Sequence, residues 1–256
     1  MEYVVSKKID GFFLTIYEGF QFTVRFFKEL LKPPYEGSEF LRQCYDIGVK
    51  SLPLITVTGF ITGLVFTKQS RPPLAEFGAT SWLPSLVGIA VVKSLAPLVT
   101  ALICAGKVGS SIGAELGSMK VTEQIDAIDV SGVNAFKYLV VSRILAGSLM
   151  LPMLMMYSAF VALLGSFIDI NANDQTSLIS FFQKSFEKLT FLDFASSVFR
   201  SIVFGFTISI TGCFKGYNTT QGTQGVGRAA NHAVVISMFL IFIEEMVIIQ
   251  LVNWLR

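Results

Sequence analysis

One small set of residues could carry nucleophilic chemistry. Ser111 lies in the segment GSSIG, residues 109–113, which matches the G-x-S-x-G pattern of serine hydrolases, and His232 is the single histidine of the chain. A Ser–His pair can activate the hydroxyl for attack on an ester or amide. No strand–turn–helix elbow is predicted around the serine, however, and small residues are common in membrane helices. An intramembrane serine hydrolase using Ser111 and His232 is therefore the alternative function rather than the favoured one.

Other signatures of catalysis are missing from the sequence. Cys44, Cys104 and Cys213 are far apart and form no C-x-x-C or metal-ligand pattern, so we interpret them as small buried side chains. The P-loop pattern G-x-x-x-x-G-K-[ST] is absent, because the Gly-Lys of residues 106–107 is followed by valine. We therefore expect no catalytic residue, metal or cofactor in this chain. If ATP drives its function, ATP and Mg²⁺ must bind a partner chain.

A short acidic segment, residues 114–133, lies between two very apolar stretches. Thr122 is expected to cap a helix of about ten residues that ends before Gly132. The helical repeat gives it one apolar and one acidic face: Val121, Ile125 and Ile128 against Thr122, Asp126 and Asp129. Such a helix suits docking into a groove on a soluble partner, and a solvated connector is the alternative. Which face would meet the partner stays open.

Several charged residues fall within apolar stretches, where a charge is costly and suggests a functional site. Lys93 is expected to face a cavity or a partner; a hydrogen bond to a carbonyl of a neighbouring helix is the alternative. Glu244 and Glu245 are adjacent and do not share one helix face, so we expect one to be paired or protonated in a structural role. Arg200 is expected to snorkel to the membrane interface.

The composition indicates which elements must position these residues. The chain has 256 residues, of which 52% are hydrophobic and only 15% are charged, against about 25% charged in a soluble domain. The net charge of +2 is too small to indicate nucleic acid as a partner. We predict an all-α multi-pass membrane protein with about five transmembrane helices. Their expected bounds are residues 47–68, 82–105, 138–167, 194–214 and 233–254.

The segments outside these spans complete the predicted topology. Residues 1–34 are amphipathic and should form a helix in the membrane interface, whereas residues 171–191 and the polar loop 216–232 should lie outside the membrane. The first span is short, so a re-entrant segment is the alternative to a full crossing. Basic residues concentrate on the side of the N-terminus, which predicts a cytoplasmic N-terminus and a periplasmic C-terminus.

Small residues recur every four positions beside the acidic segment, in a pattern that lets another helix approach closely. The expected helix-packing residues are Gly109, Gly113 and Gly117, with Ala105 before them and Gly59 and Gly63 as a second pair.

Residues 105–147, AGKVGSSIGAELGSMKVTEQIDAIDVSGVNAFKYLVVSRILAG, closely resemble the signature region of MlaE/YrbE permeases. These are the membrane subunits of ABC transporters that work with MCE-domain proteins. Residues 216–235 resemble that family's second cytoplasmic loop and last helix, and residues 41–66 resemble its first span. The resemblance implies a permease domain over residues 35–256, after the interfacial helix. Where many members carry an Arg-Glu pair in the second span, this chain has Lys93-Ser94, so the acid is absent.

The resemblance also implies a function. The chain would be an inner-membrane permease that moves phospholipid, or a related lipid, between that membrane and a periplasmic MCE-domain protein. Two copies would form the transporter, each holding one ABC ATPase subunit, and a small accessory cytoplasmic subunit is a further candidate partner. A passive scaffold or channel is another alternative, which co-purification of an ATPase would argue against.

The resemblance finally implies two groups of site residues. The segment at residues 115–132 would contact the ATPase, so the expected coupling residues are Glu115, Lys120, Thr122, Glu123, Gln124, Asp126 and Asp129. A lipid cavity would lie where the two copies meet, with the expected lining residues Phe60, Leu64, Thr67 and Lys93.

Overall fold

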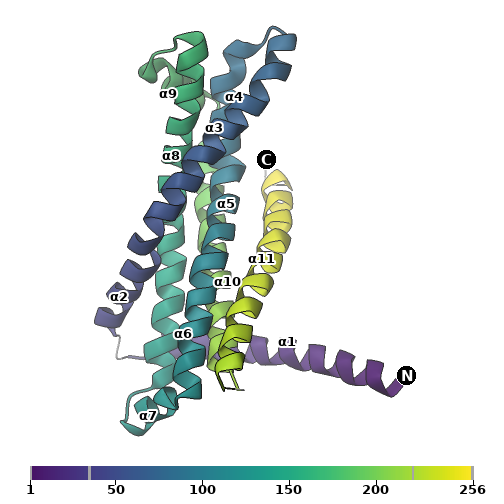
Figure 1. Ribbon diagram of the computed structural model, residues 1–256, viewed down its shortest axis with the longest axis vertical. Helices are drawn as coiled ribbons and strands as arrows, with labels where there is room; N and C mark the ends of the chain where they lie inside the picture. Colours follow the sequence, from purple (N-terminus) through teal and green to yellow (C-terminus); the bar gives the residue numbers. More distant parts are fainter. Residues whose placement is uncertain (1, 34–35, 221, 255–256) are drawn as a thin grey trace.

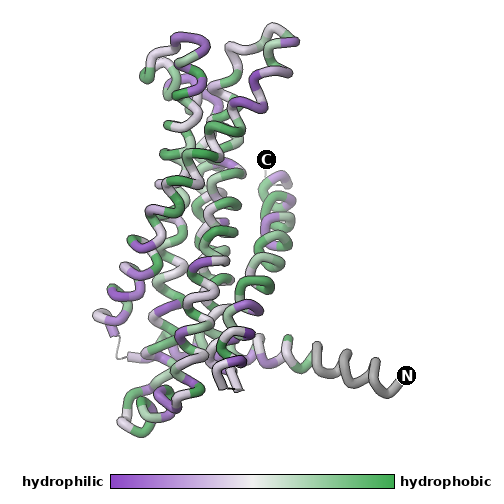
Figure 2. Tube along the Cα trace, viewed as in Figure 1, coloured by the Kyte–Doolittle hydropathy of each residue, from purple (hydrophilic) through white to green (hydrophobic). Residues whose placement is uncertain are grey.

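The computed structural model describes residues 2–33, 36–220 and 222–254, and within these ranges the chain forms helices and no strand. The prediction of an all-α protein is confirmed. Five helical segments are long and apolar enough to cross a membrane: Gly37–Glu76, Thr80–Val121, Phe136–Asp174, Phe191–Tyr217 and Gly222–Trp254. They run up and down in one bundle (Figure 1). Figure 2 shows apolar residues along the middle of the bundle and polar residues gathered at its two ends.

The N-terminal helix α1 (Glu2–Leu30) lies across the foot of the bundle, and its N-terminal half extends away from it (Figure 1). Phe22 and Phe26 hold it there, because their rings meet those of Phe136 at 5.0 Å and Phe206 at 5.6 Å. The helix ends before Pro33, which has no N–H with which to continue it. This arrangement agrees with an amphipathic helix that lies along a membrane rather than across it.

The first span is longer than the sequence suggests. It consists of α2 (Gly37–Ile47), a 3₁₀ turn (Val49–Ser51) and α3 (Leu52–Glu76). The 25 residues of α3 correspond to about 37 Å of helix, against a hydrocarbon core of about 30 Å. The helix continues for about two turns beyond residue 68, the expected end of the first span. A helix of this length has no need of a re-entrant path.

The second span is one continuous rod with two π-helical turns in it. It starts with a 3₁₀ turn (Thr80–Trp82) and runs through α4 (Leu83–Ala90), α5 (Ala96–Cys104) and α6 (Ser110–Val121). The π turns, Val91–Leu95 and Ala105–Gly109, join these pieces. Short π-helical insertions of this kind are often found at functional sites. The short helix α7 (Gln124–Val130) follows at the foot of the bundle.

The remaining helices complete the bundle. A third π turn (Phe136–Val141) leads into α8 (Ser142–Asp174), and the amphipathic helix α9 (Leu178–Glu187) covers the opposite end. The last two spans are α10 (Phe191–Tyr217) and α11 (Gly222–Trp254). The prediction of a polar loop over residues 216–232 was wrong for residues 222–232, because α11 already begins at Gly222. We call the two ends of the bundle the α7 end and the α9 end.

Close helix contacts bring α8 against α3 and α10. A Cβ atom on Gly63 would lie 1.9 Å from the carbonyl oxygen of Ala162, and one on Gly205 would lie 2.4 Å from that of Gly147. Glycine at these positions lets the backbones touch. Cys44, Cys104 and Cys213 are all free and buried, in agreement with their interpretation as core side chains.

Candidate functional site

The coupling segment forms a compact hook at the α7 end. Thr122 does not cap α7, contrary to the sequence prediction: its hydroxyl donates to the carbonyl of Ser118 at 2.8 Å, so it closes α6 instead. The chain then turns at Glu123, which adopts a left-handed conformation with φ of 58°. The helix that follows has 7 residues. Gly132 has φ of +86°, the conformation expected for a glycine that ends a helix.

The two faces of α7 have different environments. Ile125 is 0% exposed within the chain's own core, and Ile128 packs against the same core. The polar side chains of Glu123, Gln124 and Asp126 are exposed. The apolar face is therefore used to hold α7 on the bundle, and the polar face is the one that remains open to a partner. Val130, 89% exposed, adds one apolar contact point at the end of the helix.

Ion pairs and loop contacts make the hook rigid. Lys120 Nζ lies 2.8 Å from Asp126 Oδ1, which links the last turn of α6 to α7. Asp129 Oδ1 accepts a hydrogen bond of 2.8 Å from the backbone N–H of Ala135. Of the predicted coupling residues, Lys120, Asp126 and Asp129 thus contribute to the shape of the hook. Glu123 and Gln124 lie on its outer face.

Glu115 has a different environment. Its carboxylate lies 2.9 Å from the guanidinium of Arg143, which is 1% exposed and also donates to the carbonyl of Leu139 at 2.8 Å. The pair joins α6 to α8. Glu115 and Arg143 line a polar pocket of 440 Å³ together with Gln124, Glu39 and Arg42. The structure therefore brings Glu115 and Gln124 together, but Glu115 connects helices rather than extending from the hook.

The loop after α7 is attached to α1. Asn134 donates a hydrogen bond of 3.1 Å to Glu29, and Lys137 donates one to the backbone carbonyl of Lys32. A further hydrogen bond from Lys32 to Glu29 lowers the pKa of the Glu29 carboxyl from its ordinary value. The segment between α7 and α8 is thus held by α1 and the residues that follow it.

The predicted packing residues lie where α6 meets α10 and α11. A Cβ on Gly113 would lie 3.2 Å from Ala230 Cα, and one on Gly117 would lie 3.0 Å from Thr219 Oγ1. At Gly109 the nearest atom, on Ile208, would be 3.6 Å away, which is ordinary contact. The close approach therefore occurs at Gly113 and Gly117.

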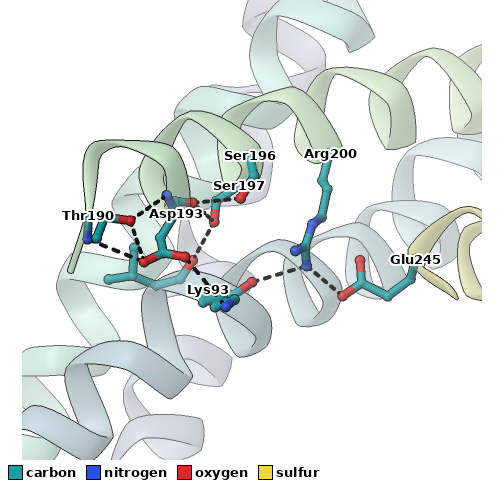
Figure 3. Close-up of polar contacts among 8 residues, drawn as sticks. Lys93, Thr190, Asp193, Ser196, Ser197, Arg200 and Glu245 are labelled. Atoms are coloured by element: carbon teal, nitrogen blue, oxygen red, sulfur yellow. Dashed lines mark hydrogen bonds and ion pairs between the residues drawn. The ribbon is translucent and has the colours of Figure 1, made fainter. Parts of the chain in front are cut away.

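A buried polar cluster lies toward the α9 end, between α10, α11 and the π turn at Val91–Leu95 (Figure 3). Lys93 Nζ lies 3.4 Å from Asp193 Oδ1. The other oxygen of Asp193 accepts hydrogen bonds from the backbone N–H and the hydroxyl of Thr190, at 3.2 and 2.8 Å. This capping box begins α10 and at the same time holds Asp193 toward Lys93.

The π turn explains two further contacts in this cluster. Within the turn the N–H of Ala96 is donated to Val91, so the carbonyl of Val92 loses its α-helical donor. The carbonyl of Lys93 lacks one too, because its α-helical donor would be the N–H that Pro97 does not have. Side chains of α10 replace both: Ser197 donates to Val92 at 2.9 Å, and Arg200 donates to Lys93 at 3.1 Å.

Arg200 and the two glutamates of α11 differ from expectation in one respect. Arg200 was expected at the membrane interface, and this was wrong: it is 1% exposed and lies 2.8 Å from Glu245. Its α11 partner supplies the charge that makes burial tolerable. Glu244 faces a different neighbour and accepts a hydrogen bond of 2.5 Å from Thr207. The adjacent acids therefore bind separate groups on α10, and the paired acid expected there is Glu245.

The predicted cavity residues divide into two groups. Phe60, Leu64 and Thr67 lie on α3, which packs closely against α8. A Cβ atom added to Gly165 of α8 would lie 2.3 Å from the carbonyl oxygen of Phe60. Thr67 is 0% exposed and its hydroxyl donates to Gly63, so it offers no polar atom to a ligand of this chain. Phe60 and Leu64 are partly exposed. Lys93 belongs to the second span and is partly exposed as well. Its ammonium pairs with Asp193 of α10.

Comparison with known proteins identifies this architecture. The family model described as Permease MlaE matches residues 40–251. The chain belongs to the MlaE permease family. The match contains the hook and the polar cluster, covers all but the outer ends of the first and last long helices, and begins after α1. An MlaE-family chain with five such helices is a multi-pass membrane protein.

Similar proteins extend this conclusion. A probable ABC transporter permease protein of Rickettsia typhi is 36% identical over 226 residues, which cover 87% of this chain and 86% of the relative. A counterpart from Synechocystis is 35% identical over 234 residues, covering 91% and 89%. The chloroplastic protein TRIGALACTOSYLDIACYLGLYCEROL 1 of Arabidopsis thaliana is 32% identical over 219 residues, covering 86% of this chain and 63% of the relative. The chain is thus a permease of the ABC transporter type, which implies an ATPase partner.

The hydrolase alternative gains no support from this MlaE-family structure. Ser111 lies within α6 and lines a groove with Asp46 and Lys50, whereas His232 lies exposed on α11. Among the residues described, no hydrogen bond joins the two side chains. The backbone around Ser111 is helical, so its N–H groups are used within the helix rather than aimed at a substrate.

Sequence reasoning missed several residues of these sites. Arg143 was not predicted to be a site residue, yet it is the buried partner of Glu115. Asp193 was not singled out at all. A signal for Asp193 was present, because Thr190 precedes it by three residues at the start of a predicted helix.

Proposed function

We propose that the chain is the lipid-moving permease of an inner-membrane ABC transporter and that the α7 end faces the cytoplasm. The observation that carries this proposal is the hook: its apolar face is buried in the chain's own core, and its acidic face is open. An ATPase subunit would bind the exposed Glu123, Gln124 and Asp126. The MlaE family and the ABC permease names of its relatives support a separate ATPase.

The structure suggests how movement at the hook would reach the membrane. Lys120 and Asp126 tie α7 to α6, and α6 continues through α5 and α4 without a break. The π turn in that rod is bound by Ser197 and Arg200 of α10. A displacement of α7 would therefore shift the second span against α10 and α11. That shift would widen or narrow a lipid cavity formed where two copies of the chain meet.

The cargo we propose is a phospholipid or a related lipid, exchanged with a periplasmic MCE-domain protein. The relative from Arabidopsis carries the name of a glycerolipid, which supports a lipid as cargo. Phe60 and Leu64 on α3 are the proposed apolar contacts for acyl chains. Lys93 is the proposed headgroup contact, and its ion pair with Asp193 would have to open for this purpose.

A double charge reversal tests the hook. Glu123→Lys with Asp126→Lys should abolish co-purification of the ATPase subunit with the tagged permease while the permease stays folded. The Lys120–Asp126 pair is exposed, so its loss should cost only about 0–1 kcal/mol. A matched control reverses two exposed acids at the α9 end, Glu76→Lys with Glu187→Lys, and should leave co-purification intact. Normal recovery of the ATPase with the hook variant would refute the assignment.

A further inference from the structure

A groove lies where α1 crosses α10 and α11 near the α7 end, apart from both sites described above. Its volume is 440 Å³ and its walls are mostly apolar. Six of its lining residues define the walls: Ile16 and Gly19 of α1, Ile210 and Phe214 of α10, and Phe239 and Leu240 of α11. None of the hook residues or polar-cluster residues lines it. The groove is therefore separate from both of those sites.

The helices around the groove are those of a membrane protein, so we expect hydrocarbon rather than water beside it. Both α10 and α11 are long and apolar enough to cross a membrane. On α1, Ile16 is 52% exposed and Phe20 is 67% exposed, as expected for a helix in the interface of a bilayer. Water gains few hydrogen bonds in an apolar space of this kind, so an acyl chain is the compatible occupant.

One cationic group stands at the groove. Lys215, in the last turn of α10, is among its lining residues, and its ammonium lies 5.1 Å from the centre of the Phe214 ring. Within the part of the chain that the structure describes, this ammonium forms no ion pair or hydrogen bond, although the charge of Glu18 acts on it. A lysine at the end of a span, next to an apolar groove, matches a phosphate above an acyl chain.

We propose that the groove holds a phospholipid of the surrounding leaflet, with an acyl chain along the apolar walls and its phosphate on Lys215. This lipid is not the cargo; it fills the angle between the interfacial helix and the bundle. The rings of Phe22 and Phe26 hold the second half of α1 on the bundle, and a bound acyl chain would add to the packing of α1 at Ile16 and Gly19.

Photo-crosslinking tests this site. The full chain is placed in nanodiscs of phosphatidylethanolamine that contain a small fraction of phosphatidylglycerol with a diazirine in one acyl chain. A second sample contains diacylglycerol with the same diazirine chain and no phosphate. After irradiation, labelled peptides are mapped by mass spectrometry. Labelling near Ile210 and Phe239 should be stronger with phosphatidylglycerol than with diacylglycerol.

Two variants separate the roles of charge and space. Lys215→Gln should lower the phosphatidylglycerol label about fivefold, as expected for one lysine near an anionic lipid. Gly19→Leu should block the groove, since a Cβ at Gly19 meets no atom within 4 Å and the side chain can enter the free space. Gly227→Leu, at another helical glycine with free space around it, is the control and should leave the label unchanged.

Some results would overturn the proposal. Equal labelling by the two lipids would show ordinary contact with the bilayer rather than a site. Undiminished labelling in both Lys215→Gln and Gly19→Leu would have the same meaning. Crosslinks from these helices to a second copy of the chain, in place of lipid, would show that protein covers the groove.

Discussion

Arg200 and Glu245 form an ion pair between α10 and α11, with 2.8 Å between the guanidinium and the carboxylate. Arg200 is 1% exposed, and the same nitrogen donates to the carbonyl of Lys93. One side chain therefore joins three separate segments: α10, α11 and the π turn of the second span. The stability of the bundle toward the α9 end should therefore depend on a counter-charge for Arg200.

Removal of one charge from this pair should be costly. Glu245→Gln keeps the shape of the side chain but leaves Arg200 buried without a counter-charge, which should lower the free energy of unfolding by about 3–5 kcal/mol. The double variant Arg200→Met with Glu245→Met should recover most of that loss, because it leaves no unpaired charge. Thermal unfolding of the purified chain in detergent measures both effects.

The neighbouring acid supplies the control for this experiment. Glu244→Gln keeps an oxygen that can accept the hydrogen bond of Thr207, so its effect should be much smaller than that of Glu245→Gln. If Glu245→Gln were as stable as the parent chain, the charge of Arg200 would have to be neutralised by another group.

The contact between α3 and α8 should be intolerant of a single methyl group. In Gly63→Ala the new Cβ would meet the backbone of Ala162, which is not free to move aside, so the helices must separate. We expect a loss of about 1–3 kcal/mol in the free energy of unfolding, the usual cost of overpacking. Gly227→Ala, where nothing lies within 4 Å, should be neutral or stabilising by about 0.5–1 kcal/mol. Similar melting temperatures for the two variants would contradict the close contact.

The stability of the hook should depend more on the glycine at position 132 than on the hydroxyl of Thr122. Gly132→Ala places a side chain at φ of +86°, which should cost about 1–2 kcal/mol. Thr122→Ala removes only a hydrogen bond to the carbonyl of Ser118 and should change stability by about 0.5 kcal/mol or less. Hydrogen exchange of the α7 amides measures the local opening. Faster exchange in Thr122→Ala than in Gly132→Ala would mean that Thr122 caps α7 after all.

Hydropathy alone was enough to predict the five spans and the amphipathic α1. An apolar stretch long enough to cross a bilayer leaves few alternatives to a helix, because its backbone groups must be satisfied internally. The spacing of Gly113 and Gly117 also indicated close helix contacts correctly. Such patterns are local, so they can be read without knowledge of the fold.

Other features depend on contacts that are distant in sequence. Arg200 looks like an interfacial residue until Glu245, on another helix, is placed beside it. Residues 222–232 look like a loop because they are polar and small, but Gly113 and Gly117 give them a helix to pack against. The role of Thr122 was mistaken because its hydroxyl can cap the helix after it or close the helix before it, and the sequence alone does not distinguish the two.

The attachment of the α7–α8 loop to α1 has a mechanical consequence. Because Asn134 and Lys137 are bonded to Glu29 and Lys32, the hook does not hang from a free tether. If α1 lies at the bilayer surface, as its amphipathic sequence predicts, then α1 sets the distance between the hook and the bilayer. A force applied to the hook along the membrane normal would then also move α1, and the lipids beneath α1 would resist that movement.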